Sequence, residues 1–111
     1  MADNARSDLL QGTLDLLILR ALQEQVLHGW AVSERIQQIS ENVLQVNQGS
    51  LYPALHRLEN KGWIKADWGV SELGRRARFY RITASGKRQL QIEHASWRKM
   101  SLAINQVLQR A

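Results

Sequence analysis

The chain of 111 residues has no cysteine, a single proline and no long apolar run. Without cysteine it has no disulfide and no thiolate metal site, which is typical of a reducing cytoplasm. A membrane span needs about 18 consecutive apolar residues, and the polar start, MADNARSD, has no apolar core of a signal peptide. One proline with 44% hydrophobic residues argues against disorder. We therefore expect one folded, cytoplasmic domain that is not a membrane protein.

Acidic residues are also scarce, because 10 Asp and Glu stand against 15 Lys and Arg. The formal net charge of +5 favours a polyanionic partner, with nucleic acid first and an anionic membrane surface second. A basic surface that is merely solvated remains the alternative on charge alone.

Catalytic and metal-binding patterns are missing as well. His28, His56 and His94 are far apart, and none has another histidine or a carboxylate at a spacing typical of metal ligands. No phosphate-binding loop, dinucleotide fingerprint or nucleophile elbow is present. No pair of acids is placed for general acid/base work. We expect no enzyme activity, no metal and no cofactor.

What the chain does contain is a short amphipathic segment, SLYPALHRLENKGWI, from Ser50 to Ile64. Leu51, Leu55 and Leu58 follow the i, i+4, i+7 spacing of an apolar helix face. The opposite face carries polar groups. Gly62 is typical of the left-handed residue that ends a helix, and extended residues follow. This order predicts a recognition helix, starting between Gln48 and Ser50 with Asn47 or Ser50 as its cap, that runs into a wing.

Two helices are expected before this segment. The first spans residues 9–24 after a frayed segment 1–8, and the second begins at residues 28–30 and ends at 40–42. Leu16 lies off the main apolar face of the first helix, so that helix is expected to be buried on more than one side. Residues 44–46 alternate like a very short strand. The expected inward residues of the two helices are Leu10, Leu14, Leu17, Ile18, Ala21 and Leu22, and then Val32, Ile36 and Ile39.

A β-hairpin is expected after the recognition helix. Strands at 63–68 and 77–82 are rich in aromatic and β-branched residues, and a loop at 69–76 joins them. Arg75, Arg76 and Arg78 lie at or beside this turn, where guanidinium groups suit phosphate oxygens. A solvated basic turn is the common alternative for each arginine taken alone.

The last expected helix, at about residues 85–109, has a second apolar pattern. Leu90, Trp97 and Ile104 are seven residues apart, and Met100, Val107 and Leu108 fall between and after them. Such a seam is typical of a helix that pairs with a second copy. An amphipathic helix that folds back on its own domain is the alternative.

Several segments together resemble the PadR family of bacterial transcriptional regulators, in order and in spacing over nearly the whole chain. They are GTLDLLIL at 12–19, HGWAV at 28–32, QGSLYPALHRLE at 48–59 and GRRARFYRIT at 74–83. The Leu-Tyr-Pro-Ala-Leu and Gly-Arg-Arg segments are the specific markers. The chain resembles the short subclass with one C-terminal helix. Trp30 and Phe79 stand where the family usually has tyrosine, so a hydroxyl is lost at both positions.

The resemblance implies a mostly α-helical fold with a small β-hairpin, in which a winged helix-turn-helix (1–84) precedes a C-terminal dimerisation helix (85–111). It implies a homodimeric repressor that binds a pseudo-palindromic operator in double-stranded DNA. The residues that match the DNA-facing segment and the wing are Gln48, Ser50, Leu51, Tyr52, Pro53, His56, Arg57, Arg75, Arg76 and Arg78. The expected dimer interface contains Leu90, Trp97, Ile104, Val107 and Leu108.

In some drug-sensing relatives a tryptophan of the last helix stacks on planar ligands, and Trp97 matches that position. A small aromatic ligand is thus a second partner implied for Trp97, although the ring could equally fill the dimer seam. Two alternatives to an operator-binding repressor stay open. One is a winged helix used only as a protein-interaction module, and the other is a protein whose main role is to sense a small molecule or drug.

Overall fold

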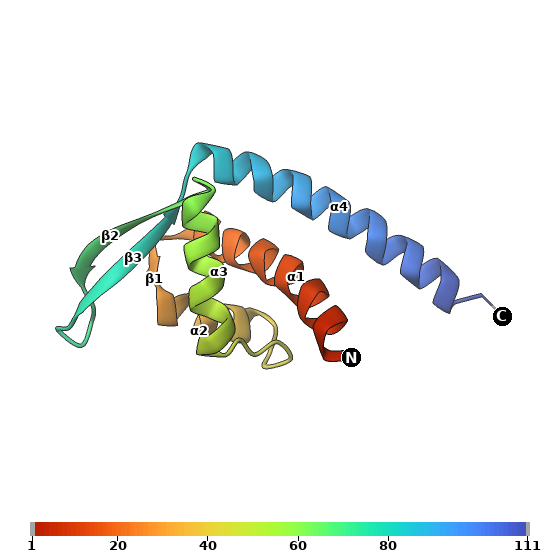
Figure 1. Cartoon of the computed structure of the whole chain (residues 1–111), viewed down its shortest axis with the longest axis horizontal. Helices are drawn as coiled ribbons and strands as arrows, with labels where there is room; N and C mark the ends of the chain where they lie inside the picture. The colour runs from red at the N-terminus through yellow and green to blue at the C-terminus, as the bar shows by residue number, and fades with distance from the viewer. Residues whose placement is uncertain (1, 111) are drawn as a thin grey trace.

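The computed structural model describes residues 2–110, with side chains from residue 12 onward. Its central body combines three helices and a small sheet, and one long helix leaves that body (Figure 1). The longest dimension of the molecule is 56 Å and the other two are 28 Å. The elements are α1 (Ala2–Glu24), β1 (Leu27–His28), α2 (Gly29–Ile39), α3 (Gln48–Asn60), β2 (Ile64–Val70), β3 (Arg76–Ile82) and α4 (Ala84–Leu108).

The core lies where α1 meets α2, α3 and the sheet. Leu51, Leu55 and Leu58 of α3 are fully buried, as their spacing predicts. Leu19 of α1 is fully buried too, although it lies off the predicted face, so α1 is covered on more than one side. Ile39 was expected in the core but is 56% exposed, because it is the last residue of α2, where the helix runs out beyond its neighbours.

Helix α1 is longer than predicted, because it begins at Ala2 rather than at residue 9. The expectation of a frayed segment 1–8 is therefore wrong for residues 2–8, and Met1 lies outside the described residues. The side chains of Leu9 and Leu10 also lie outside the described side chains. Leu14, Leu16 and Leu17 pack partly buried against the core.

The sheet has three antiparallel strands in the order β1-β3-β2. Strands β2 and β3 form the predicted hairpin, with Ile64 opposite Ile82 and Val70 opposite Arg76. The strands extend further toward the tip than predicted, which leaves only residues 71–75 as the turn. The third strand is at Leu27–His28, paired with Tyr80 and Phe79, whereas the strand expected at residues 44–46 does not form.

Helix α3 is held in place by specific caps. Asn47 is its N-cap, and the Asn47 side chain accepts a hydrogen bond from the Ser50 amide at 2.9 Å. At the other end Gly62 has a φ of +75°, and the amides of Gly62 and Trp63 donate to the carbonyls of Glu59 and Leu58. This Schellman arrangement turns the chain directly into β2. Pro53 lies in the second turn, inside the helix.

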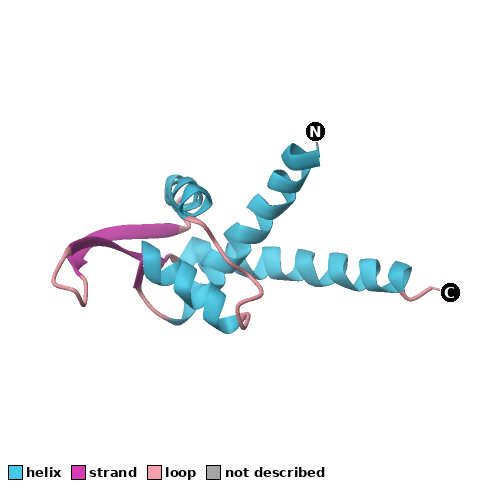
Figure 2. Ribbon diagram, turned by 90° about the horizontal axis from the view of Figure 1, so that it is seen from below, coloured by secondary structure: helices cyan, strands magenta, loops and turns pink. Residues whose placement is uncertain are grey.

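Helix α4 begins on the body and then leaves it. Thr83 caps its first turn, where the Oγ1 atom accepts from the Gly86 amide at 3.0 Å. Gly86 has no room for a Cβ, which would lie 2.0 Å from the Trp63 carbonyl oxygen, so the start of α4 packs directly on the backbone after α3. Leu90 is buried, but the helix then diverges from α1 toward solvent (Figure 2).

Helices α2 and α3 with the β2–β3 hairpin form a winged helix-turn-helix. Within residues 2–110, no helix is both long and apolar enough to cross a membrane. No three metal-ligating side chains gather among the described residues.

Candidate nucleic-acid interface

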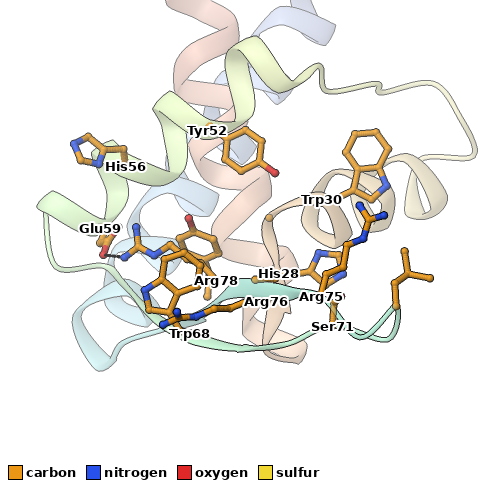
Figure 3. Close-up of a pocket in the computed structure, with 14 residues that line it drawn as sticks. His28, Trp30, Tyr52, His56, Glu59, Trp68, Ser71, Arg75, Arg76 and Arg78 are labelled. Atoms are coloured by element: carbon orange, nitrogen blue, oxygen red, sulfur yellow. Dashed lines mark hydrogen bonds and ion pairs between the residues drawn. The ribbon is translucent and has the colours of Figure 1, made fainter.

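An open groove of about 780 Å³ lies between α3, the start of α2 and the wing, which is the β2–β3 hairpin. In Figure 3, side chains from α3 line one side, and arginines and Trp68 of the wing line the other. The groove is therefore formed by the two elements expected to meet nucleic acid. Its lining residues from these elements include Tyr52, His56, Glu59, Trp68, Arg75, Arg76 and Arg78.

Helix α3 presents its polar face outward. Tyr52 is 45% exposed, and Pro53 and His56 are exposed as well. Gln48 and Ser50 are exposed in the first turn of the helix. Hydroxyl, amide and imidazole groups on one exposed helix face can pair with base edges or phosphates.

Two residues of the predicted DNA-facing set point elsewhere. Leu51 is fully buried in the core, so its side chain does not belong to the exposed face. Arg57 makes an ion pair with Asp15 of α1, and both side chains are partly buried. The reason is rotation along the helix, which turns these two positions toward α1. We correct both assignments: Leu51 is a core residue, and Arg57 joins α3 to α1.

The arginines of the wing differ in their partners. Among the described residues, Arg75 and Arg76 make no ion pair, and both are exposed. The guanidinium carbon of Arg76 lies 4.7 Å from the centre of the Trp68 ring. This stacking leaves the edge of the guanidinium, where the N–H donors lie, free to bind an anion. Arg78 instead bonds Glu59 of α3 at 2.8 Å.

The groove is also lined by aromatic rings whose role there was not predicted from the sequence: His28, Trp30, Trp68 and Tyr80. His28 caps α2 by accepting a hydrogen bond on Nδ1 from the Ala31 amide at 3.3 Å. Its ring meets Phe79 edge-on at 5.8 Å. Burial raises the pKa of the Tyr80 hydroxyl, so Tyr80 stays neutral beside the arginines. The period-2 pattern of β3 could have shown that Arg76, Arg78 and Tyr80 share one face.

A second candidate surface lies on α4. After Leu90 this helix exposes a series of large apolar side chains that nothing in the described chain covers. Leu90 itself is 4% exposed and packs in the core of its own chain, which corrects its assignment to a dimer seam. The exposed apolar residues are Ile92, Trp97, Met100, Leu102, Ile104, Val107 and Leu108.

Comparison with known proteins gives a consistent result. The profile of the transcriptional regulator PadR-like family matches residues 18–92. An uncharacterized protein from Lysinibacillus sphaericus is 34% identical over 90% of this chain and 92% of that protein. A transcriptional regulator from Mycobacterium tuberculosis is 37% identical over 68% of this chain and 66% of that protein.

Solved structures agree. A transcriptional regulator from Clostridium thermocellum is 30% identical, with a TM-score of 0.80 over 89% of this chain and 96% of that one. A PadR-like regulator from Bacillus cereus is 29% identical, with a TM-score of 0.78 over 94% of this chain and 99% of that one.

Proposed function

Because the chain belongs to the PadR-like family of transcriptional regulators, we propose that it is a repressor that binds a pseudo-palindromic operator as a homodimer. Members of this family regulate transcription and are not enzymes. The observation that carries the proposal is that residues of the exposed face of α3 and the exposed arginines at the wing tip, Arg75 and Arg76, line one groove. We propose that the protein acts in the cytoplasm, on double-stranded DNA.

In this mechanism α3 enters the major groove, which is wide enough for a helix. Tyr52 and His56 reach base edges from the middle of the exposed face, and Pro53 lies against the groove between them. Gln48 and Ser50, in the first turn, bind base edges or the adjacent phosphate. Exposure of all five side chains in the free protein supports this role.

The wing supplies a different kind of contact. Arg75 and Arg76 carry positive charge at the end of the hairpin, so they suit the phosphate backbone or a narrow minor groove beside the operator half-site. These contacts give affinity and salt dependence, whereas α3 gives sequence preference. The net charge of +5 supports this division, because it favours association with DNA of any sequence.

Dimerisation is proposed through residues 85–111, with residues 1–84 forming the DNA-binding part. The support is the apolar face of α4, on which Trp97 and Ile104 are seven residues apart and about half exposed. A groove of about 250 Å³ between Ala103, Ile104, Val107 and Leu108 continues this face. Contiguous exposed apolar surface of this kind marks an interface. Two recognition helices would then read half-sites about 34–36 Å apart, or a multiple of that distance.

A small aromatic inducer is the second candidate function, and Trp97 is the residue that supports it. Its indole ring is 47% exposed on the face proposed for dimerisation, so it would lie in the interface with the second copy. A planar ligand could stack there and change the spacing of the recognition helices.

The deciding experiment is selection of bound sequences from random duplex DNA with the intact protein. We expect enrichment of an inverted repeat whose half-sites are one or more helical turns apart. An enriched single half-site would contradict operator binding by a dimer. Retention of all sequences equally, or of none, would contradict sequence-specific regulation and favour a protein-interaction role.

A further inference from the structure

Arg78 lies nearer the core of the protein than Arg75 and Arg76, which are at the tip of the wing. The hairpin register places Ile64, Ala66 and Trp68 opposite Ile82, Tyr80 and Arg78, so these residues share one face of the sheet. That face is buried at Ile64 and Tyr80 and becomes exposed toward the tip. Arg78 is thus the point where the wing leaves the core, and it lies opposite the last turns of α3.

Its guanidinium group is held from several sides. The Nη2 atom donates to Oε2 of Glu59 at 2.8 Å, as the dashed line in Figure 3 shows. The guanidinium carbon lies 5.9 Å from the ring centres of both Trp68 and Tyr80. The Nε atom is buried without a hydrogen-bond partner among the described residues. A planar guanidinium group that bonds a carboxylate and lies near two aromatic rings has few orientations open to it.

The ion pair with Arg78 also neutralises the negative charge of Glu59. Glu59 is the one acidic side chain that lines the groove among the described residues, next to the surface proposed for DNA. An unpaired carboxylate there would repel phosphates, and an ion pair cancels that charge locally. The pair also connects α3 directly to β3, two elements whose relative position decides where the wing lies when α3 is in the major groove.

We propose that the Arg78–Glu59 ion pair is a brace that sets the position of the wing relative to α3, and that Arg78 does not contact DNA. This inference rests on the proposed function and reassigns Arg78 within it. Both residues are positioning residues that act through α3 and the wing. Phosphate contact by the wing is then limited to Arg75 and Arg76.

The variant Glu59→Gln separates the two roles of Arg78 by the sign of its effect. If Arg78 is part of the brace, Glu59→Gln and Arg78→Met each lower the ratio of affinities for the selected operator and a random duplex. A loss of roughly two- to fivefold is expected for a partly exposed pair. The double variant should be no worse than either single one, because each change breaks the same ion pair. If Arg78 binds phosphate, Glu59→Gln should instead strengthen binding, because it frees the arginine and removes a negative charge.

A salt titration gives an independent measure. The slope of log affinity against log salt should stay unchanged in Arg78→Met but fall by about one in the matched control Arg75→Met, whose arginine makes no ion pair with any described residue. The charge swap Glu59→Arg with Arg78→Glu should recover part of the affinity ratio. A lower slope for Arg78→Met, tighter binding by Glu59→Gln, or further loss in the swap would overturn the brace.

A measurement without DNA keeps the two proposals distinguishable. In urea unfolding of the intact protein, the two single variants should together cost more stability than the double variant, which shows coupling in the free protein. Additive effects would overturn the brace whether or not DNA binds. Coupling with no enrichment in the selection experiment would leave the brace in place and contradict the operator-binding role.

Discussion

The ring of Tyr52 lies directly on Gly29, at the point where α3 crosses the start of α2. A Cβ at position 29 would be 2.9 Å from Cε1 of Tyr52 and 3.3 Å from its hydroxyl oxygen. The first of these distances is shorter than packed carbon atoms tolerate, so the absence of a side chain at Gly29 allows the ring to lie there. The direction in which Tyr52 leaves α3 therefore depends on a residue of another helix.

This contact predicts the effect of Gly29→Ala. Gly29 is the first residue of α2, so the preference for alanine over glycine in helix interiors does not fully apply, and the stability of the fold should change little. The added methyl group must, however, displace the Tyr52 ring, which is 45% exposed and free to move outward. We expect weaker binding to the selected operator with unchanged binding to random DNA, measured by fluorescence anisotropy.

Gly12→Ala is the matched control, because a Cβ there meets no atom of the described residues within 4 Å and Gly12 does not line the groove. It should leave operator binding unchanged. A Gly29→Ala variant that binds the operator as the original protein does would show that the position of the Tyr52 ring does not matter for recognition.

His56 tests the base-reading role of α3 more directly. It is exposed on α3 and lines the groove without a hydrogen-bond partner or ion pair among the described residues. His56→Ala should cost about 1–3 kcal/mol of operator binding if the imidazole reads a base edge, and should relax the sequence preference at that base pair. Equal losses on operator and random duplexes would refute this role and indicate a phosphate contact.

For the arginines at the wing tip we expect a loss of binding that does not depend on the DNA sequence. Arg75→Ala combined with Arg76→Ala should weaken binding to all duplexes, because these side chains are proposed to neutralise phosphates. The salt slope should fall by roughly one for each phosphate that is no longer neutralised. A matched control is Arg81→Ala, because Arg81 lies on the other face of β3 and pairs with Asp67 at 3.6 Å. If the double variant keeps the original slope, the wing does not bind the backbone.

Local patterns were sufficient to predict most of the fold. Leucine spacing predicted the buried face of α3, and Gly62 predicted its end, because these features depend on residues close in sequence. The short strand at Leu27–His28 could not be predicted in the same way. Two residues are too few to show the alternation of apolar and polar side chains that marks a strand. This strand forms only because it pairs with Tyr80 and Phe79, which are more than fifty residues away.

In the site too, features that depend on nearby residues were predicted, and features that depend on tertiary contacts were not. Exposure of Tyr52, Pro53 and His56 follows from the helical pattern, and it matches the prediction. The partners of Arg57 and Arg78 did not follow from it, because Asp15 and Glu59 come from other elements and meet the arginines only in the tertiary structure. The same is true of Leu90, whose seven-residue spacing from Trp97 suggested one seam although α4 is still packed on its own body at that point.

The apolar face of α4 leads to the last prediction. Trp97→Asp places a charge at the centre of the exposed stripe, where burial against a second copy would desolvate it. Because Trp97 lies outside the core of its own chain, the domain should keep its helical circular dichroism spectrum. Light scattering should then report the mass of a monomer.

The control Lys99→Asp adds the same carboxylate to the opposite side of α4, and it should keep the dimer. Operator affinity should fall in the first variant and not in the second, since each half-site would have to be bound without its partner. A Trp97→Asp protein that still has the mass of a dimer would show that the chains pair through another surface.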